Sequence, residues 1–505
     1  MDGSPIPRLS EGADRPDPGE QRMMLRFPYL LAGLLSYLGV MAFVLSFLFE
    51  AVSLDAAEQV LWTQSLRLGY GIQPPLYTWL QWVMFGVFGV NVAALVLTKE
   101  ILIATTAITT YFIAKRIAQN ERIAGLTLIS FLLIPQFSYE SHRDLTHSIL
   151  ACALAALGLY LALKLLEEHR RLRTYLLFGV IAGLGLLAKY SYGLFLLSLC
   201  IAMLSLPHAR QAMRDRRFWL AVLVAAAMFA PHGFWLWTAF DAQIQGQMAR
   251  KLQPLTETQV VTDITRGLFS LATVTAGFFA LLIPTYGWAF FFRNRCGSRP
   301  AQTQRSHERL LARLLLIQLL LLLGLVLVFQ VSGFKQRWMQ PLLFAVPIYL
   351  LVQVRPWFNE LSCRRLVALG TVIGFCTLAM LPVRVLLPDA FEGHKRFNTP
   401  FGALAEDLRH HGFVGGVIAT EDHWMGGNLR LEFPDSAIIT PNFTPAGAGE
   451  PIALAVWQGE AMPPELAELL RKARAQDLLT QQPRVIQLRY HYSQRTSATF
   501  SYLAG

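Results

Sequence analysis

The chain has 505 residues, of which 54% are hydrophobic and 15% are charged, and its formal net charge is +11. Soluble domains carry about 25% charged residues, so this composition excludes an ordinary soluble protein. The basic residues lie in short loops between apolar runs, a placement that sets membrane topology and argues against a nucleic-acid-binding face. The five cysteines show no paired spacing, so we expect neither disulfides nor a cysteine metal site.

Residues 1–21 are rich in Pro, Gly, Asp and Arg, which predicts a disordered cytoplasmic N-terminus. Eleven apolar runs follow, and we predict that each crosses a bilayer as a helix. Residues 22–387 are therefore expected to form an all-α polytopic membrane domain. The runs lie at about 27–49, 82–114, 123–138, 145–163, 175–189, 191–206, 218–238, 267–292, 310–331, 341–354 and 366–387.

Lys and Arg gather in alternate loops, for example at 115–122, 210–217 and 355–365. The positive-inside rule places these loops in the cytoplasm. The N-terminus is then cytoplasmic, and the loop after the first span and the C-terminal segment lie outside. For a bacterial protein this predicts a multi-pass inner-membrane protein with a periplasmic C-terminus.

After about residue 388 the chain becomes more polar and richer in Pro, Gly and Asn. Short β-type runs alternate with helical runs, which predicts a small extracytoplasmic α/β domain over residues 388–505. We expect strands at 416–420, 437–440, 452–457 and 484–489, and helices at 424–433 and 463–475.

The first outer loop, residues 55–80, holds two acids, Asp55 and Glu58, followed by several aromatic residues. A carboxylate at the membrane boundary is costly unless it has a function or a partner. One interpretation is structural: Asp55 caps a helix, Glu58 completes a capping-box-like pattern, and the aromatic residues form an interfacial belt. The other is a sugar site, because aromatic rings beside a carboxylate suit a carbohydrate.

Four sequence patterns occur in chain order. The first lies in the first outer loop and consists of Asp55, Trp62, Leu66, Gly69-Tyr70, Pro74-Pro75-Leu76 and Trp79-Leu80. The other three are GLGLLAKY at Gly183 to Tyr190, PHGFW at Pro231 to Trp235, and KQRW at Lys335 to Trp338. Over about residues 27–350 the chain thereby resembles the family 39 glycosyltransferases. These GT-C membrane enzymes include protein O-mannosyltransferases, lipid A aminoarabinose transferases and rhizobial lipopolysaccharide galacturonosyltransferases. Many members have Glu directly after the first Asp; here that position is Ala56, and Glu58 is shifted by two residues.

The resemblance implies inverting transfer of a sugar from a polyprenyl-phosphate donor to an acceptor hydroxyl on the outer face of the membrane. The acceptor class, whether lipopolysaccharide, another glycolipid or a protein, stays open. A base must take the acceptor proton, and fixed cations must face the departing phosphate. The resemblance makes Asp55 the base and Glu58 or Asp144 a second acid. The family patterns make Lys189, Lys335 and Arg337 candidates for the donor phosphate, and in the polar second outer loop His142 or Arg143 is a further candidate. The candidates for sugar or acceptor contacts are Trp62, Tyr70, Tyr77, Tyr190 and Trp338.

Alternatives remain for several of these residues. Lys189 is also explained as a snorkelling lysine, and the second outer loop, residues 139–144, as a solvated turn. Asp144 is a candidate to orient the base or to bind a divalent metal. No metal-ligand set is evident, since the Glu421-Asp422-His423-Trp424 stretch offers a single His. No cofactor is assigned, and a divalent metal stays open.

The competing function is a polytopic transporter or a flippase for lipid-linked sugars. Transporters often carry ionisable residues in mid-span and internal repeats. In this chain the singled-out charges gather at one face, and no repeat is visible. These observations favour the glycosyltransferase, with a lipid-linked sugar and a lipid or glycan acceptor as its partners.

Overall fold

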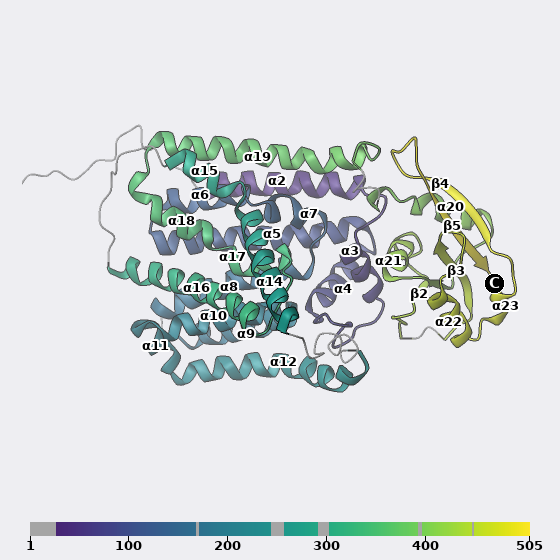
Figure 1. Cartoon of the computed structure of the whole chain (residues 1–505), viewed down its shortest axis with the longest axis horizontal. Coiled ribbons are helices and arrows are strands. Elements are labelled where there is room, and N and C mark those ends of the chain that lie inside the picture. The colour runs from purple at the N-terminus through teal and green to yellow at the C-terminus, as the bar shows by residue number, and fades with distance from the viewer. Residues whose placement is uncertain (1–26, 168–170, 244–256, 291–301, 392–395, 447–448) are drawn as a thin grey trace, which may run out of the picture.

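The computed structural model describes residues 27–167, 171–243, 257–290, 302–391, 396–446 and 449–505. Long helices run along the long axis of the molecule, and a sheet domain covers one end of the bundle (Figure 1). The predicted disordered segment 1–21 and the basic residues at 291–301 lie outside the described residues.

Six helices among the described residues have the length and hydropathy to cross a membrane, and bent helix pairs raise the number to as many as ten. The six are α2 (Phe27–Leu48), α5 (Val92–Ala118), α8 (His147–Glu167), α12 (Arg216–Gln243), α16 (Gln302–Leu327) and α19 (Glu360–Leu386). In the first bent pair, α6 (Glu121–Phe131) is followed by η1 (Gln136–Glu140) and α7 (Ser141–Arg143). The second pair is α10 (Ser191–Leu204) with α11 (Pro207–Arg214), and the third is α14 (Glu257–Phe279) with α15 (Leu282–Phe290). In the fourth, α17 (Gln336–Leu343) is followed by α18 (Val346–Val354) and η2 (Arg355–Trp357).

The shorter apolar helix α9 (Leu172–Ala188) coincides with the fifth predicted run, 175–189. The all-α polytopic class is therefore confirmed.

The prediction of one continuous span over 82–114 is wrong. Helix α4 (Leu76–Phe88) ends at Gly89, which has a φ of 79°, and Asn91 starts α5 by accepting a hydrogen bond from the Ala94 amide at 2.9 Å. Gly with positive φ ends helices, and Asn is a favoured N-cap. Helix α4 thus joins α3 (Leu54–Trp62) in a layer between the bundle and the sheet domain (Figure 1).

The C-terminal segment forms the predicted small α/β unit, with a five-stranded sheet of order β2-β1-β3-β5-β4. The pairs β1–β2 and β1–β3 are parallel, whereas β5 runs antiparallel to β3 and β4. The strands are β1 (Val417–Thr420), β2 (Ala437–Ile439), β3 (Ile452–Gln458), β4 (Arg484–Arg489) and β5 (Ser497–Ala504). The prediction missed β5 and the short helix α20 (Phe401–His410).

The two faces of the sheet have different partners. Helices α22 (Pro464–Lys472) and α23 (Gln476–Leu479) share one buried apolar cluster with one face. The opposite face shares its core with α20, α21 (His423–Glu432) and α3. Ala57 and Leu61 of α3 belong to the same buried cluster as Met425 and Leu429 of α21. The first outer loop and the sheet domain are therefore packed around one core.

Helix α21 crosses α3 with the two backbones in contact. A Cβ on Gly427 would overlap the backbone carbonyl group of Ala57, so this position requires glycine. One turn on, the buried Arg430 donates Nη1 hydrogen bonds to the Val60 carbonyl oxygen and to Thr63 Oγ1, the latter at 2.8 Å. A buried guanidinium needs such acceptors, so Arg430 fixes how the sheet domain sits on α3.

Gly427→Ala should loosen this contact, because overpacking a tight site costs about 1–3 kcal/mol. We expect a thermal unfolding midpoint lower by several degrees in detergent and faster proteolytic release of the C-terminal domain. Gly449→Ala is the matched control, since a Cβ there meets no atom within 4 Å. Equal stability of the two variants would contradict the close α3–α21 crossing.

Candidate active site

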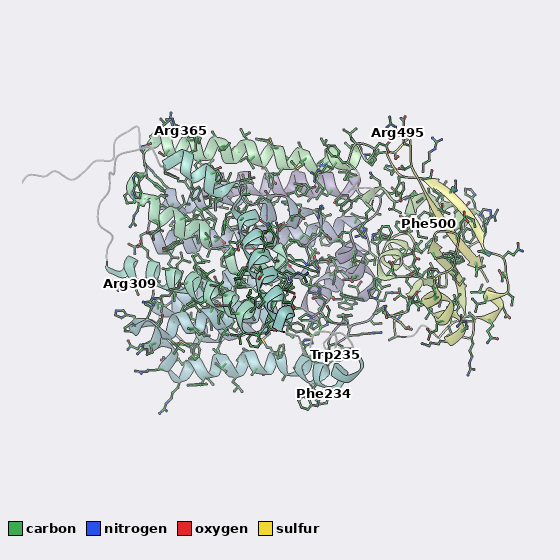
Figure 2. The ribbon with its side chains drawn as sticks, in the orientation of Figure 1. Phe234, Trp235, Arg309, Arg365, Arg495 and Phe500 are labelled. Atoms are coloured by element: carbon green, nitrogen blue, oxygen red, sulfur yellow. The ribbon has the colours of Figure 1, made fainter. Side chains whose placement is uncertain are left out.

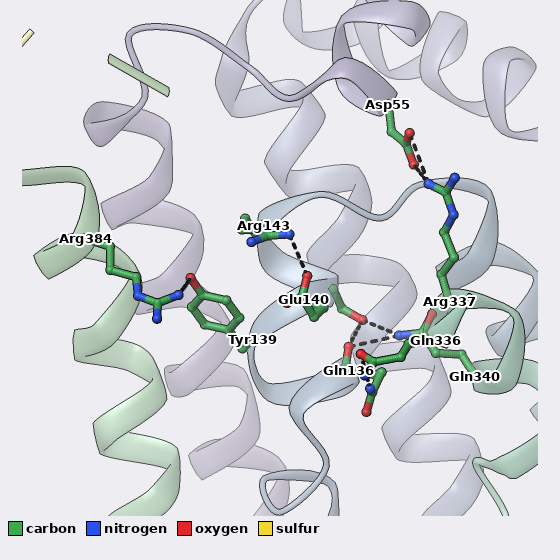
Figure 3. Close-up of polar contacts among 10 residues, drawn as sticks. Asp55, Gln136, Tyr139, Glu140, Arg143, Gln336, Arg337, Gln340 and Arg384 are labelled. Carbon is green, nitrogen blue, oxygen red and sulfur yellow. Dashed lines mark hydrogen bonds and ion pairs between the residues drawn. The ribbon is translucent and has the colours of Figure 1, made fainter. Parts of the chain in front are cut away.

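Asp55 lies in the first turn of α3 and points toward Arg337 of α17 (Figure 3). Arg337 Nη1 is 3.0 Å from Asp55 Oδ2 and 3.4 Å from Oδ1. Ser53 occupies the N-cap position of α3, so capping is not the task of Asp55. The carboxylate is instead held by a cation from a distant part of the chain.

The surroundings of Asp55 make it a stronger base than a free aspartate. Burial raises the pKa of Asp55 to about 6, and the negative charges of Asp144 and Glu58 also raise it, whereas Arg337 and Lys189 lower it. Efficient general bases have pKa values near the working pH. A carboxylate of this pKa is ionised at neutral pH and is well suited to accept a proton.

Three of the four predicted phosphate-binding cations gather beside Asp55. Lys189 follows the last residue of α9 and donates a hydrogen bond from Nζ to Ser148 Oγ. Lys335 occupies the N-cap position of α17, two residues before Arg337. Lys189 interacts electrostatically with Asp55, Arg337 and Lys335. The three cations and the carboxylate form one polar centre at the end of the bundle next to α3 and the sheet domain.

A buried hydrogen-bond chain that sequence reasoning missed fixes this centre. Thr78 Oγ1 donates to Gln59 Oε1 at 2.7 Å, and Gln59 Nε2 lies 3.3 Å from His147 Nε2. His147 Nδ1 donates to the carbonyl oxygen of Ala188 at 3.2 Å. The chain links α3 and α4 to α8 and to the end of α9, directly before Lys189.

Most of the predicted aromatic contacts pack inside the first outer loop. Trp62 and Tyr70 stack with ring centroids 5.5 Å apart and are only 6% and 3% exposed. Tyr77 is fully buried, and its ring lies 5.4 Å from that of His147. These three rings shape the loop and present little open surface to a ligand.

Tyr190 and Trp338 are more open than those three rings. Tyr190 is 43% exposed, and its hydroxyl lies 3.2 Å from His232 Nε2. Trp338 is half-buried and contacts Phe334 edge-on. Tyr190 therefore has the most open surface among the five predicted aromatic contacts.

The outer end of α12 anchors the loop from the side. His232 Nδ1 donates to the Leu68 carbonyl oxygen at 2.6 Å. Trp235 packs so closely on Gly69 that a Cβ there would overlap its ring. Figure 2 shows Trp235 on the loop side of α12 and Phe234, which is 71% exposed, pointing away. The 231–235 segment thus holds the first outer loop in place.

The remaining predicted acids and Arg143 have separate partners. Glu58 Oε1 lies 3.7 Å from Nδ1 of His423, at the start of α21. Asp144 acts electrostatically on Asp55, and its Oδ1 is buried with no hydrogen-bond partner. Arg143 Nη2 pairs with Glu140 Oε2 at 2.9 Å. Asp144 therefore faces the base, whereas Glu58 connects to the C-terminal domain.

Sequence reasoning also missed two ionisable residues inside the bundle, Lys99 and Glu100. Lys99 of α5 is buried and interacts electrostatically with Asp144, Glu100 and Asp55. His142 Nδ1 lies 2.7 Å from Glu100 Oε1, and both residues are buried. The available signal was the Lys-Glu pair within an apolar run, because ionisable residues in a span mark functional sites. No group of three or more His, Cys, Asp or Glu suited to a metal occurs in the part of the chain that the structure describes.

The family and the relatives that match this chain are glycosyltransferases. Residues 72–235 match the family described as dolichyl-phosphate-mannose-protein mannosyltransferase. The lipopolysaccharide core galacturonosyltransferase RgtB of Rhizobium johnstonii is 31% identical over 84% of this chain and 86% of its own length. RgtA of the same organism, with the same description, is 30% identical over 81% of this chain and 83% of its own.

Solved structures agree on the fold. ArnT from Cupriavidus metallidurans in the apo state aligns with a TM-score of 0.56 over 94% of this chain and 98% of its own, at 13% identity. A second structure of that ArnT is bound to undecaprenyl phosphate. The overlap includes the bundle and the C-terminal domain, so the whole architecture is of the GT-C type.

The identity to RgtB and RgtA, the matching fold and the carboxylate with its cations lead to one conclusion: this chain belongs to the GT-C membrane glycosyltransferases, in the family of the lipopolysaccharide core galacturonosyltransferases.

Proposed function

We propose that this protein transfers a hexuronic acid, in the manner of a galacturonosyltransferase, from a polyprenyl-phosphate carrier to a hydroxyl of a lipopolysaccharide core. The observation that carries the proposal is the 31% identity to a core galacturonosyltransferase over 84% of this chain. The transfer of a pentose is the alternative that this proposal sets aside.

In the proposed reaction Asp55 removes the proton from the acceptor hydroxyl. The hydroxyl oxygen attacks the anomeric carbon on the face opposite the phosphate, and the bond from that carbon to the phosphate oxygen breaks. The sugar is transferred with inversion, and polyprenyl phosphate leaves with its negative charge. Lys189, Lys335 and Arg337 stabilise that charge, which is the electrostatic help such a leaving group needs.

A uronic acid donor suits this number of cations. It carries two anionic groups, the phosphate and the carboxylate of the sugar. Arg337 already contacts Asp55 at 3.0 Å, so it is shared between the base and the donor. The positive charges of Lys189 and Lys335 remain for a second anion, and the Lys335 side chain is exposed. Arg and Lys recognise phosphate and carboxylate through charge-assisted hydrogen bonds.

We propose that residues 22–387 form the membrane domain and residues 388–505 the periplasmic domain, with the N-terminus in the cytoplasm. Arg309 and Arg365 lie at the end of the bundle opposite the sheet domain, which fits the positive-inside rule (Figure 2). Alkaline phosphatase fused after Gly505 should therefore be active, because the enzyme works only outside the cytoplasm. An inactive phosphatase fusion with an active cytoplasmic reporter at the same position would reverse the orientation.

The decisive assay uses the full chain in nanodiscs with a lipopolysaccharide core acceptor. Polyprenyl phosphate carrying galacturonate is compared with the same carrier bearing a pentose. Mass spectrometry should show the acceptor gaining one hexuronosyl unit from the first donor. Pentose transfer in preference to hexuronate would overturn the proposed sugar.

In the same assay Asp55→Asn should lower transfer by about a hundredfold to ten-thousandfold, the usual loss of a general base. Asn keeps the shape of Asp but cannot accept the proton. Glu58→Gln is the matched control one turn away and should have a smaller effect. Full activity of Asp55→Asn would refute the assignment of the base.

The pH dependence follows from the raised pKa of Asp55, about 6. The carboxylate is protonated below that pH, so kcat/KM should fall as the pH drops through about 6. Asp144→Asn removes a charge that raises the pKa and should move the acid limb to lower pH. Arg337→Gln removes a charge that lowers the pKa and should move the limb to higher pH. Shifts in the same direction for the two variants would exclude Asp55 as the titrating base.

A further inference from the structure

Two guanidinium groups lie around one aromatic ring, on the side of the site away from Arg337 (Figure 3). Arg384, in the last turn of α19, donates from Nη1 to the Tyr139 hydroxyl at 3.1 Å, and its guanidinium carbon is 5.6 Å from the Tyr139 ring centroid. The guanidinium carbon of Arg143, from α7, is 5.8 Å from the same centroid. We call Arg143, Arg384 and Tyr139 the second cationic centre.

The second cationic centre carries more positive than negative charge. Arg143 has an ion pair with Glu140, but Arg384 has none within the described part of the chain, and its hydrogen bond goes to a neutral phenol. Glu140 is the carboxylate that interacts electrostatically with both arginines. Two guanidinium groups that share one carboxylate keep a net positive charge, which favours the binding of an anion.

Apolar packing closes one side of the second cationic centre. Beneath Tyr139, α2 and α19 are sealed by a buried apolar cluster made of Met41, Leu45, Leu48, Val96, Tyr139, Leu381, Val385 and Phe397. An anion cannot approach through that packing. Arg143 and Glu140 are each about one-third exposed or less, at 28% and 30%, so a ligand from the outer side can reach them.

The second cationic centre is distinct from the cations assigned to the donor. Lys189 and Arg337 act on Asp55 directly, whereas the arginines of the second centre act on Glu140. Figure 3 shows the Arg143–Glu140 pair between Asp55 with Arg337 on one side and Arg384 with Tyr139 on the other. Inversion requires the acceptor to approach from the face opposite the leaving phosphate. With the donor phosphate at Arg337, as proposed above, the second cationic centre lies on the side left for the acceptor.

We propose that Arg143 and Arg384 bind an anionic group, phosphate or carboxylate, of the acceptor glycolipid and so direct its hydroxyl to Asp55. This inference rests on the proposed function and adds to it how the acceptor is recognised. It moves Arg143 from the donor phosphate, where the sequence analysis placed it, to the acceptor. Tyr139 is a positioning residue that orients Arg384.

The test measures KM for acceptor and donor with the full chain in nanodiscs of zwitterionic lipid. The acceptor is a lipopolysaccharide core preparation in three forms: native, with its phosphates removed, and with its carboxyl groups reduced. Arg384→Gln should raise the acceptor KM about tenfold or more, as loss of a charge-assisted contact does, and leave the donor KM unchanged. For the wild-type protein, either the dephosphorylated or the carboxyl-reduced acceptor should show a similar rise in KM. With that acceptor, Arg384→Gln should raise the KM no further.

Arg364→Gln is the matched control, because it removes an arginine from the cytoplasmic end of the same helix, where Arg364 is 65% exposed and paired with Glu360. It should not change the acceptor KM. Arg384→Lys keeps a cation and should recover part of the loss, and an unchanged thermal midpoint of Arg384→Gln shows that the variant is folded.

Three outcomes would overturn the inference: an unchanged acceptor KM in Arg384→Gln, a rise in the donor KM instead, or an effect that follows the anionic lipid content of the nanodisc. Wild-type protein that transfers nothing to any acceptor would count against the proposed function. In that case acceptor binding can still be measured without donor and compared between wild type and Arg384→Gln. Failure of the proposed function is thereby distinguished from failure of this inference.

Discussion

The ion pair between Asp55 and Arg337 is the interaction around which the site is built. A carboxylate at the edge of a membrane tends to take up a proton and become neutral, because burial disfavours its charge. Asp144 and Glu58 add to that tendency, and Arg337 opposes it. The two partners come from α3 and α17, 282 residues apart. Much of the surrounding structure serves to hold these two helices in register.

Membrane helices could be predicted well because hydropathy and the length of a span are local properties of the sequence. Where the prediction of 82–114 failed, the deciding residues were Gly89 and Asn91, two weak signals within an apolar stretch. Strand β5 was missed because its place in the sheet depends on pairing with β3 and β4. Such pairing is a property of the tertiary structure.

The site was predictable to the extent that a loop pattern records its chemistry. The family resemblance marked Asp55, Lys189, Lys335 and Arg337, and the fold brings these together. The same pattern could not show that Trp62 and Tyr70 stack inside the loop, because an aromatic residue is equally suited to packing and to binding. Nor could it show that Glu58 meets His423, since that contact depends on the docking of α21 onto α3.

The core shared by α3 and α21 has a consequence for how the protein is made. Ala57 and Leu61 follow directly after helix α2, whereas their partners Met425 and Leu429 are synthesised only after the membrane helix α19. Until then the apolar face of α3 has no cover, and the Val60 carbonyl oxygen lacks the guanidinium of Arg430. The carboxylate-bearing helix therefore reaches its final packing only after α21 has been made, so a nascent chain that stops before α21 is left without a finished site.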